Sequence, residues 1–284
     1  MDQPFAPVRD VSVDRIRKAL DLARQERDRA FNGPAEGPRP IDAVSRALVP
    51  AAIEYTITQV FSPSAELLES NRIVSAASAS PAAAAFRMLR TQVLQRMVEN
   101  SWRSLAIFSP CRDEGKTTTA INLAVSLAND HLHTVLLVDF DLRRPTMSAK
   151  LGVNPRKGTD DLLRGEADVQ DCLYHPAGFD RLVVLPARAA MENSSEALAG
   201  RRSRDLVAEL RSRYPDRILL FDLPPILEAD DALAFAPLVE CGLVVVAEGS
   251  TRREDLLRCM ELLRKTPIVG TVLNLATDTT SAYG

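Results

Sequence analysis

The stretch that decides the fold is Pro110-Cys111-Arg112-Asp113-Glu114-Gly115-Lys116-Thr117-Thr118. It follows the apolar run 104–109 and precedes the Ala- and Leu-rich run 117–129. A strand, a loop ending in Gly-Lys-Thr and then a helix form the context of a phosphate-binding P-loop. N–H groups of such a loop converge on phosphate oxygens, and the helix dipole adds positive potential. We therefore predict that Lys116 reaches the β- and γ-phosphates of a nucleotide and that Thr117 ligates Mg²⁺. The other residues expected to bind the nucleotide here are Arg112, Asp113, Glu114, Gly115 and Thr118.

Two features of this loop depart from the usual pattern. Pro110 stands where G-x-x-x-x-G-K-[ST] has its first glycine. Asp113 and Glu114 place two carboxylates beside the expected polyphosphate, and like charge lowers affinity there unless both side chains point away. The alternative is a Gly-Lys-Thr that occurs by chance in a strand–helix turn.

Carboxylates follow two other apolar runs. The run 135–138 is followed by Asp139 and Asp141, and the run 218–221 is followed by Asp222. Ligands of open α/β sheets bind at the carboxyl ends of the strands, so these side chains are expected to face the same crevice as the P-loop. Carboxylate oxygens are the ligands that Mg²⁺ prefers. This arrangement argues against a chance Gly-Lys-Thr.

The candidate strands are almost continuously apolar. They are 104–109, 134–139, 181–185, 217–222, 242–247 and 268–273. Strands without polar alternation are buried on both faces, as in a parallel sheet covered by helices. Helical patterns occur near 82–98, 117–129, 203–213, 231–237 and 252–264. The sequence therefore predicts an α/β fold with a doubly wound, mostly parallel sheet and a P-loop, in a nucleotide-binding domain spanning 81–284.

A different kind of sequence precedes this domain. Within residues 1–31, apolar side chains recur at spacings of three and four, at Val13, Ile16, Leu20 and Ala23. This spacing predicts an amphipathic helix that either packs on its own domain or docks on a partner. Three prolines and two glycines between residues 32 and 40 indicate that a linker begins there. We expect this linker to span 32–80 and to be partly ordered, with local structure near 67–74.

Composition excludes several function classes. The 284 residues carry 35 basic and 38 acidic side chains, a net charge of −3, and only 5% are aromatic. A generally basic nucleic-acid binder and base recognition by stacking are therefore not expected. No apolar run approaches the roughly 18 residues of a membrane helix, and the N-terminus lacks the pattern of a secretory signal. A cytoplasmic protein is expected.

Two motifs carry a resemblance to a known family. The stretches Val135-Leu136-Leu137-Val138-Asp139-Phe140-Asp141-Leu142-Arg143-Arg144-Pro145 and Ile218-Leu219-Leu220-Phe221-Asp222-Leu223-Pro224-Pro225 follow the Gly-Lys-Thr loop in this order. Over about residues 81–275 the chain resembles the bacterial tyrosine kinases of capsule and exopolysaccharide biosynthesis. These belong to the deviant-Walker P-loop ATPases, which also include partition and division-site proteins.

The resemblance implies ATP and Mg²⁺ as cofactors and assigns roles to particular residues. Lys116, Asp139 and Asp141 correspond to the catalytic residues of the family. Thr117, Asp139 and Asp222 correspond to its metal-binding residues, and Asp222 is the Walker B position. The chemistry implied is phosphoryl transfer to a tyrosine hydroxyl or to water.

The resemblance also implies partners. It predicts a homo-oligomer that regulates exopolysaccharide assembly with an inner-membrane polysaccharide co-polymerase, and that reaches the membrane only through this partner. Asn274 corresponds to a family residue that contacts adenine.

The chain departs from the family pattern at several positions. Arg112 and Asp113 replace the usual Pro-Gly of the loop, and Ala84 stands in place of a Glu used between subunits. The kinases end in a cluster of tyrosines, whereas Tyr283 is alone in this tail and is the candidate phosphoacceptor. Altered nucleotide handling and the loss of multi-site phosphorylation are the expected consequences.

Two other functions remain open. A partition-type ATPase switch is less favoured, because Cys111 occupies the place of that class's second lysine and no amphipathic C-terminus is evident. A regulatory scaffold that binds nucleotide without kinase activity is the other alternative.

Overall fold

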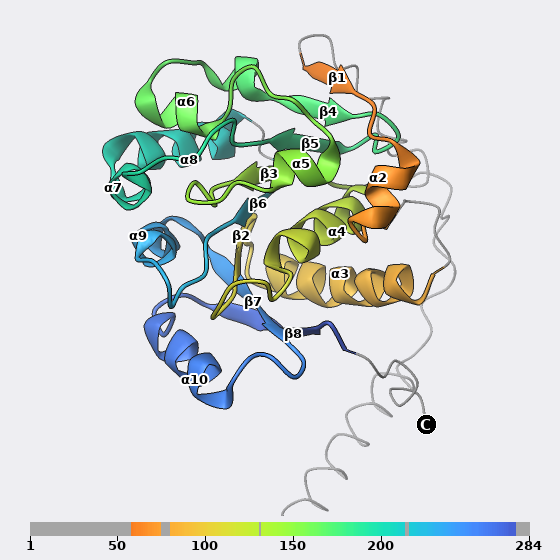
Figure 1. Ribbon diagram of the computed structural model, residues 1–284, viewed down its shortest axis with the longest axis vertical. Coiled ribbons are helices and arrows are strands. Elements are labelled where there is room, and N and C mark those ends of the chain that lie inside the picture. Colours follow the sequence, from red (N-terminus) through yellow and green to blue (C-terminus); the bar gives the residue numbers. More distant parts are fainter. Residues whose placement is uncertain (1–57, 75–79, 131, 214–215, 277–284) are drawn as a thin grey trace, which may run out of the picture. The chain divides into compact units, whose positions relative to one another are not determined.

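The computed structural model describes residues 58–74, 80–130, 132–213 and 216–276 (Figure 1). The helix expected within 1–31 and the tail that contains Tyr283 lie outside this part of the chain.

An eight-stranded sheet runs through the described residues in the order β1-β4-β5-β3-β6-β2-β7-β8. Its strands are β1 (Gln59–Phe61), β2 (Ser104–Phe108), β3 (Thr134–Asp139), β4 (Tyr174–Pro176), β5 (Leu182–Leu185), β6 (Arg217–Asp222), β7 (Cys241–Ala247) and β8 (Ile268–Asn274). Neighbouring strands pair in parallel except β4 and β5, which are antiparallel. The predicted doubly wound, mostly parallel sheet is confirmed, and the six predicted strands correspond to β2, β3, β5, β6, β7 and β8.

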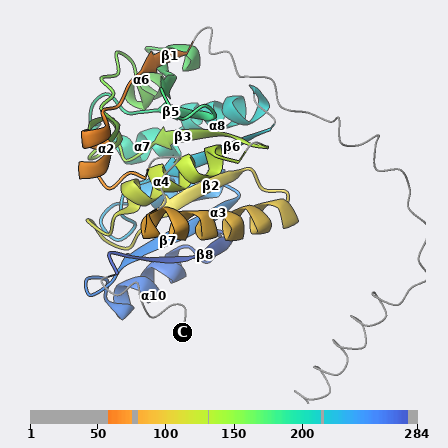
Figure 2. The same cartoon turned by 90° about the vertical axis from the view of Figure 1, so that its right-hand side faces the viewer.

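Helices cover both faces of this sheet (Figure 2). They are α2 (Ala65–Ser70), α3 (Pro81–Glu99), α4 (Lys116–Ala128), α5 (Met147–Leu151), α6 (Thr159–Arg164), α7 (Ser194–Ala199), α8 (Arg201–Arg213), α9 (Asp231–Phe235) and α10 (Arg253–Leu262), with the 3₁₀ turns η2 (Val169–Cys172) and η3 (Ala236–Leu238). The helices α2 to α5 pack in one core layer, and α6 to α10 pack in the other. Among the described residues, no helix has the length and apolar character needed to span a membrane.

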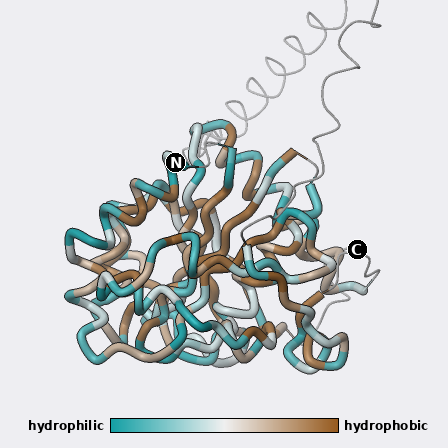
Figure 3. Tube along the Cα trace, turned by 90° about the horizontal axis from the view of Figure 1, so that it is seen from above, coloured by the Kyte–Doolittle hydropathy of each residue, from teal (hydrophilic) through white to brown (hydrophobic). Residues whose placement is uncertain are grey.

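The alternation of side chains along β2 shows why this strand is central. Leu105 and Ile107 join the core layer that contains α4, whereas Ala106 and Phe108 join the opposite layer. All five residues of the strand are buried, as expected for a strand with neighbours and helices on every side. Figure 3 shows the same pattern, with apolar strands inside and hydrophilic segments around them. Buried strands hold the loops at their carboxyl ends in fixed positions.

Two short strands, β1 at the edge of the sheet and β4 beside it, were not predicted from the sequence. β1 lies within the range expected to be linker, and it pairs with β4 through Gln59 opposite Tyr174. Each of these strands has only three residues, too few to display a periodic pattern. α2 follows β1, and the Ser64 hydroxyl caps it by accepting a hydrogen bond from the Leu67 N–H. The chain before Pro81 therefore contributes a strand and a helix to the fold.

Candidate nucleotide-binding site

The P-loop connects β2 to α4, and its conformation requires glycine at one position. Gly115 has φ 81°, and a Cβ atom there would lie 1.9 Å from the Asn274 side-chain nitrogen. That nitrogen donates to the Glu114 carbonyl at 2.9 Å, so the end of β8 holds the loop in place. α4 begins at Lys116 without a side-chain cap. The first N–H groups of a helix have no partner within the helix, and they form a site for phosphate oxygens.

The two carboxylates of the loop take different positions. The Glu114 side chain is buried and accepts hydrogen bonds from the Cys111 N–H at 2.9 Å and from the Thr251 hydroxyl. Burial raises the pKa of Glu114. Asp113 has φ 59°, in the left-handed region that Asp enters more readily than most residues. This geometry explains why Asp113 can replace the glycine of the family loop.

The charge of Arg112 is neutralised by Glu228, a residue outside the loop. The backbone N–H of Arg112 donates to Glu228 Oε1 at 2.9 Å, and the Arg112 guanidinium forms an ion pair with the same carboxylate. Glu228 lies in the segment after β6, which was not singled out in the sequence. The ion pair ties the loop to that segment but leaves Arg112 with little charge to offer a phosphate.

Three carboxylates converge beside the loop, as predicted. Asp139 and Asp222 are opposite each other in the register of β3 and β6. Asp222 accepts from Lys116 Nζ at 2.6 Å through one oxygen and from the Thr117 hydroxyl at 2.6 Å through the other. Lys116 Nζ also lies 3.5 Å from Asp141 Oδ2. These neighbouring charged and polar residues form one group, which we call the phosphate-site cluster: Lys116, Thr117, Asp139, Asp141 and Asp222.

Asp139 is the least satisfied member of this cluster. Its side chain is fully buried, and one oxygen accepts from the Asp141 N–H at 3.1 Å. The other oxygen has no hydrogen-bond partner among the described residues. Burial, followed by the charges of Asp222 and Asp141, raises the pKa of Asp139 well above its usual value. A buried carboxylate oxygen without a partner is the kind of group that a cation satisfies.

Lys116 and Asp141 also have shifted pKa values. Burial opposes the charged form of Lys116, but Asp222 and Asp141 outweigh it and raise the pKa of the ammonium group. Burial raises the pKa of Asp141, whereas the Lys116 charge acts in the opposite direction. In the phosphate-site cluster the single lysine, Lys116, thus interacts with the charges of three carboxylates, those of Asp222, Asp141 and Asp139.

The residues present fit a magnesium ion. Thr117, Asp139 and Asp222 supply hard oxygen donors close together. Within the described ranges, no group of three or more His, Cys, Asp or Glu residues has the geometry of a complete metal site. Mg²⁺ commonly uses one or two carboxylates together with water and substrate phosphates, so this donor set suits a metal that arrives with a nucleotide.

A cavity of about 400 Å³ opens beside the cluster. The loop residues Arg112–Thr118 line it, together with Asp141, Arg143, Arg144, Thr146, Lys150, Pro224, Pro225 and Glu228. A second cavity of about 370 Å³ shares Gly115, Thr118 and Lys150 with the first. Its other walls include Asn71, Arg72, Phe86, Asn122, Asn274 and Leu275. The predicted P-loop residues and Asp141 thus line the first cavity, and Asn274 lines the second. We call these two neighbouring cavities the groove. Asp139 and Asp222 are fully buried and are not among the residues that line it.

Several residues at this groove were missed in the sequence. Thr251 holds Glu114, and Asn122 holds the segment before α3 by donating to the Arg72 carbonyl at 2.9 Å and accepting from the Val74 N–H at 2.8 Å. Neither contact has a local signal, because the partners are about 50 or more residues apart.

Comparisons with known proteins agree with this geometry. A family model described as an AAA domain matches residues 113–248. The putative tyrosine-protein kinase CapB of Staphylococcus aureus is 30% identical over 202 residues, which cover 70% of this chain and 86% of CapB. The chain belongs to the family of bacterial tyrosine-protein kinases. Within this family, the crystal structure of the VpsO kinase domain is 31% identical with a TM-score of 0.62, and the match covers 69% of this chain and 96% of that domain.

Two further comparisons concern proteins that are not named as tyrosine kinases. The succinoglycan biosynthesis transport protein ExoP of Rhizobium meliloti is 33% identical over 215 residues, covering 72% of this chain but only 26% of ExoP. This kinase-family chain therefore spans about a quarter of that relative. The septum site-determining protein MinD of Pyrococcus horikoshii, solved with Mg-ADP, is 25% identical with a TM-score of 0.52, covering 60% of this chain and 69% of MinD. The MinD structure supports a P-loop ATPase fold of the MinD type for this chain.

Proposed function

We propose that this chain is a protein-tyrosine kinase that uses Mg-ATP, phosphorylates a second copy of itself and regulates exopolysaccharide assembly. The observation that carries this proposal is the phosphate-site cluster, in which a buried carboxylate oxygen without a partner among the described residues accompanies a P-loop lysine that lines the cavity. Membership of the bacterial tyrosine kinases supports transfer to tyrosine. The similarity to ExoP supports a role in exopolysaccharide production.

Nucleotide binding uses the loop and the start of α4. The N–H groups of this segment and the Lys116 ammonium bind the β- and γ-phosphates, so that Lys116 exchanges part of its contact with Asp222 for phosphate oxygens. Thr117, Asp139 and Asp222 hold Mg²⁺, which supplies neutralisation of the phosphate charge when it is bound. Asn274 contacts the base, because it lines the second cavity.

Asp141 is the residue best placed to receive the acceptor's proton. It lines the phosphate cavity and is partly accessible, whereas Asp139 is fully buried. The raised pKa of Asp141 brings it closer to that of an effective general base. The proton of the tyrosine hydroxyl passes to Asp141, the γ-phosphoryl group moves to the tyrosine oxygen, and ADP leaves. Tyr283 of a neighbouring copy is the proposed acceptor.

The remaining parts of the proposal concern organisation. The segment 1–31, for which the sequence predicts a helix, and the expected linker that follows connect the domain to an inner-membrane polysaccharide co-polymerase, while the domain itself stays in the cytoplasm. The P-loop domain carries the nucleotide chemistry and forms a homo-oligomer in which one copy presents its tail to the next.

The test is incubation of the purified full chain with Mg²⁺ and γ-labelled ATP, following label on protein and free phosphate together. Alkali-stable protein label that is lost in Lys116→Met and in Tyr283→Phe, but kept in the matched variant Tyr55→Phe, supports the kinase. Free phosphate without protein label favours an ATPase switch. Nucleotide binding without either product overturns the enzyme and favours a scaffold.

A further inference from the structure

Lys150 occupies the junction of the two cavities. It lines both of them, together with Gly115 and Thr118 of the P-loop segment. Gly115 and Thr118 come from the loop and α4, whereas Lys150 comes from α5. No feature of the sequence singled out this lysine.

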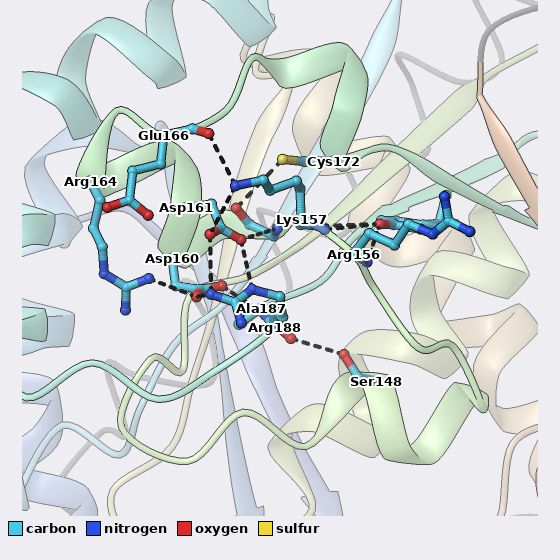
Figure 4. Close-up of polar contacts among 12 residues, drawn as sticks. Ser148, Arg156, Lys157, Asp160, Asp161, Arg164, Glu166, Cys172, Ala187 and Arg188 are labelled. Carbon is cyan, nitrogen blue, oxygen red and sulfur yellow. Dashed lines mark hydrogen bonds and ion pairs between the residues drawn. The ribbon is translucent and has the colours of Figure 1, made fainter.

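The helix that carries Lys150 is firmly anchored. Met147 and Leu151 are buried in the core, and the Ser148 hydroxyl donates to the Ala187 carbonyl at 2.9 Å, a contact drawn in Figure 4. The Lys150 carbonyl accepts from the Asn71 side-chain nitrogen at 3.4 Å. The backbone of Lys150 is therefore held from the core and from the segment before α3, so its side chain extends from a fixed base.

The charge of Lys150 is uncommitted, unlike that of most cations at the groove. Arg112 is paired with Glu228, Lys116 with Asp222, and Arg143 Nε lies 2.7 Å from Asp231. Within residues 58–74, 80–130, 132–213 and 216–276, no carboxylate forms an ion pair with Lys150. Arg144 and Arg72 are likewise without an ion pair in these ranges, but Arg144 lines only the first cavity and Arg72 only the second.

We propose that Lys150 binds the α-phosphate of the nucleotide, an inference that rests on the proposed nucleotide site. A nucleotide with its β- and γ-phosphates at Lys116 and its base at Asn274 reaches from the first cavity into the second, and its α-phosphate adjoins the phosphates at Lys116. Lys150 lines both cavities, as Gly115 and Thr118 at the start of α4 do. Lys150 supplies positive charge that the loop lacks, because Arg112 is paired with Glu228 and Asp113 adds a negative charge.

The experiment is calorimetric titration of the full chain with ADP and with ATP, each with Mg²⁺. A charge-assisted contact of this kind predicts that Lys150→Met weakens both nucleotides by about tenfold. Lys150→Arg keeps the positive charge and is expected to stay within about threefold of the parent. Lys265→Met removes an exposed lysine outside the groove and is the matched control, with unchanged affinity expected. Melting of the unliganded variants checks that each one folds.

Each result separates this inference from the proposed function. Equal losses for ADP and ATP in Lys150→Met, with the control unchanged, support it. Unchanged affinity in Lys150→Met, when Lys116→Met abolishes binding, overturns the role of Lys150 and leaves the nucleotide site intact. Loss for ATP alone also overturns the inference, because it places the lysine at the γ-phosphate. Absence of binding by the parent chain overturns the proposed function itself.

Discussion

Two groups of buried carboxylates lie side by side at the carboxyl ends of β3 and β5, and they are satisfied very differently. One is the phosphate-site cluster. The other, which we call the α6 cluster, consists of Asp160 and Asp161 with the cations around them (Figure 4). A hydrogen bond of 2.9 Å from the Thr159 hydroxyl to the Asp139 carbonyl joins the two groups.

In the α6 cluster every carboxylate oxygen has a donor. Asp161 accepts from the Gly158 N–H at 3.0 Å and from Arg188 at 3.0 and 3.2 Å. Asp160 accepts from the Arg188 N–H at 2.8 Å and from Arg164 at 3.0 Å. Burial alone would raise the pKa of Asp161, but the hydrogen bonds from Arg188 and Gly158 outweigh it and lower the pKa.

The phosphate-site cluster has three carboxylates and one lysine, and one oxygen of Asp139 lacks a partner in the described part of the chain. Satisfied buried charge holds loops together, whereas under-satisfied buried charge is a feature of sites that receive a ligand. The comparison therefore assigns a structural role to the α6 cluster and a binding role to its neighbour.

The largest expected effect comes from removing the lysine of the phosphate-site cluster. Lys116→Met leaves the three carboxylates facing the phosphates without a cation, so ADP affinity is expected to fall by about 100-fold or more. Calorimetric titration measures it. Lys157→Met is the matched control, because Lys157 lies 3.6 Å from Asp161 in the α6 cluster. A comparable loss of ADP affinity in the control would contradict the division of roles.

The second effect is on stability and concerns the α6 cluster. Asp161→Asn turns an amide N–H₂ toward the donors of Arg188 and Gly158, and we expect a loss of about 2 kcal/mol in the free energy of unfolding at pH 7. The figure is moderate because Arg188 is partly exposed. The lowered pKa means that Asp161 stabilises the fold above its unfolded-state pKa, near 3.8, and that this contribution is lost as the pH falls through the folded-state pKa.

Urea unfolding at pH 7 and pH 3 measures this prediction. The difference between Asp161→Asn and the parent should be smaller at pH 3. The exposed neighbour Glu166→Gln should behave like the parent at both values. If Asp161→Asn unfolded like the parent at pH 7, the structural role of the cluster would be wrong.

Much of the phosphate-site cluster was predictable from the sequence, because each member is adjacent to a strong local pattern. Asp139 and Asp222 end apolar runs, and Lys116 and Thr117 follow a loop glycine, so the parallel sheet alone brings them together. The side chains of Asp160 and Asp161 had no such signal. Their partner Arg188 lies 27 and 28 residues later in the chain, and only the packing of α6 on the end of β5 joins them.

The elements of the fold that were not predicted also lack a local sequence pattern. β1 and β4 are three-residue strands that pair across more than 100 residues, and α5 and α6 are too short to show helical periodicity. Of these short elements, α5 carries Lys150, which lines both cavities. The groove was therefore predicted at the P-loop and missed at α5.

The third prediction is a gain in the free energy of unfolding, whereas the second is a loss. Asp139→Asn keeps the shape of the side chain and the acceptor for the Asp141 N–H, but it removes a buried charge. The raised pKa means that the stabilising contribution of protonated Asp139 is present at low pH and is lost as the pH rises through the folded-state pKa. We expect the variant to be about 1 kcal/mol more stable than the parent at pH 8 and similar to it at pH 4.

Urea unfolding at pH 8 and pH 4 measures the gain in stability. Calorimetric titration with ADP, with and without Mg²⁺, measures the effect of the same substitution on nucleotide binding. The enhancement of ADP affinity by Mg²⁺ should shrink in Asp139→Asn. Asp161→Asn, the same substitution in the α6 cluster, should keep that enhancement. A less stable Asp139→Asn at pH 8 would show that the charge of Asp139 is satisfied in the unliganded protein.

The smallest expected effect comes from Glu114, in which each carboxylate oxygen has a donor, as in the α6 cluster. Thr251→Val removes the hydroxyl that donates to Glu114 and accepts from the Ala247 N–H at 2.8 Å. Glu114 keeps the Cys111 N–H, so the loop loses one of its ties but not its conformation. A weakening of ADP affinity by about threefold follows from the loss of one neutral hydrogen bond. Thr251→Ser restores the hydroxyl and should restore the affinity. A loss as large as that of Lys116→Met would mean that Thr251 binds the nucleotide directly, and then Glu114 would belong with the unsatisfied carboxylates that await a ligand.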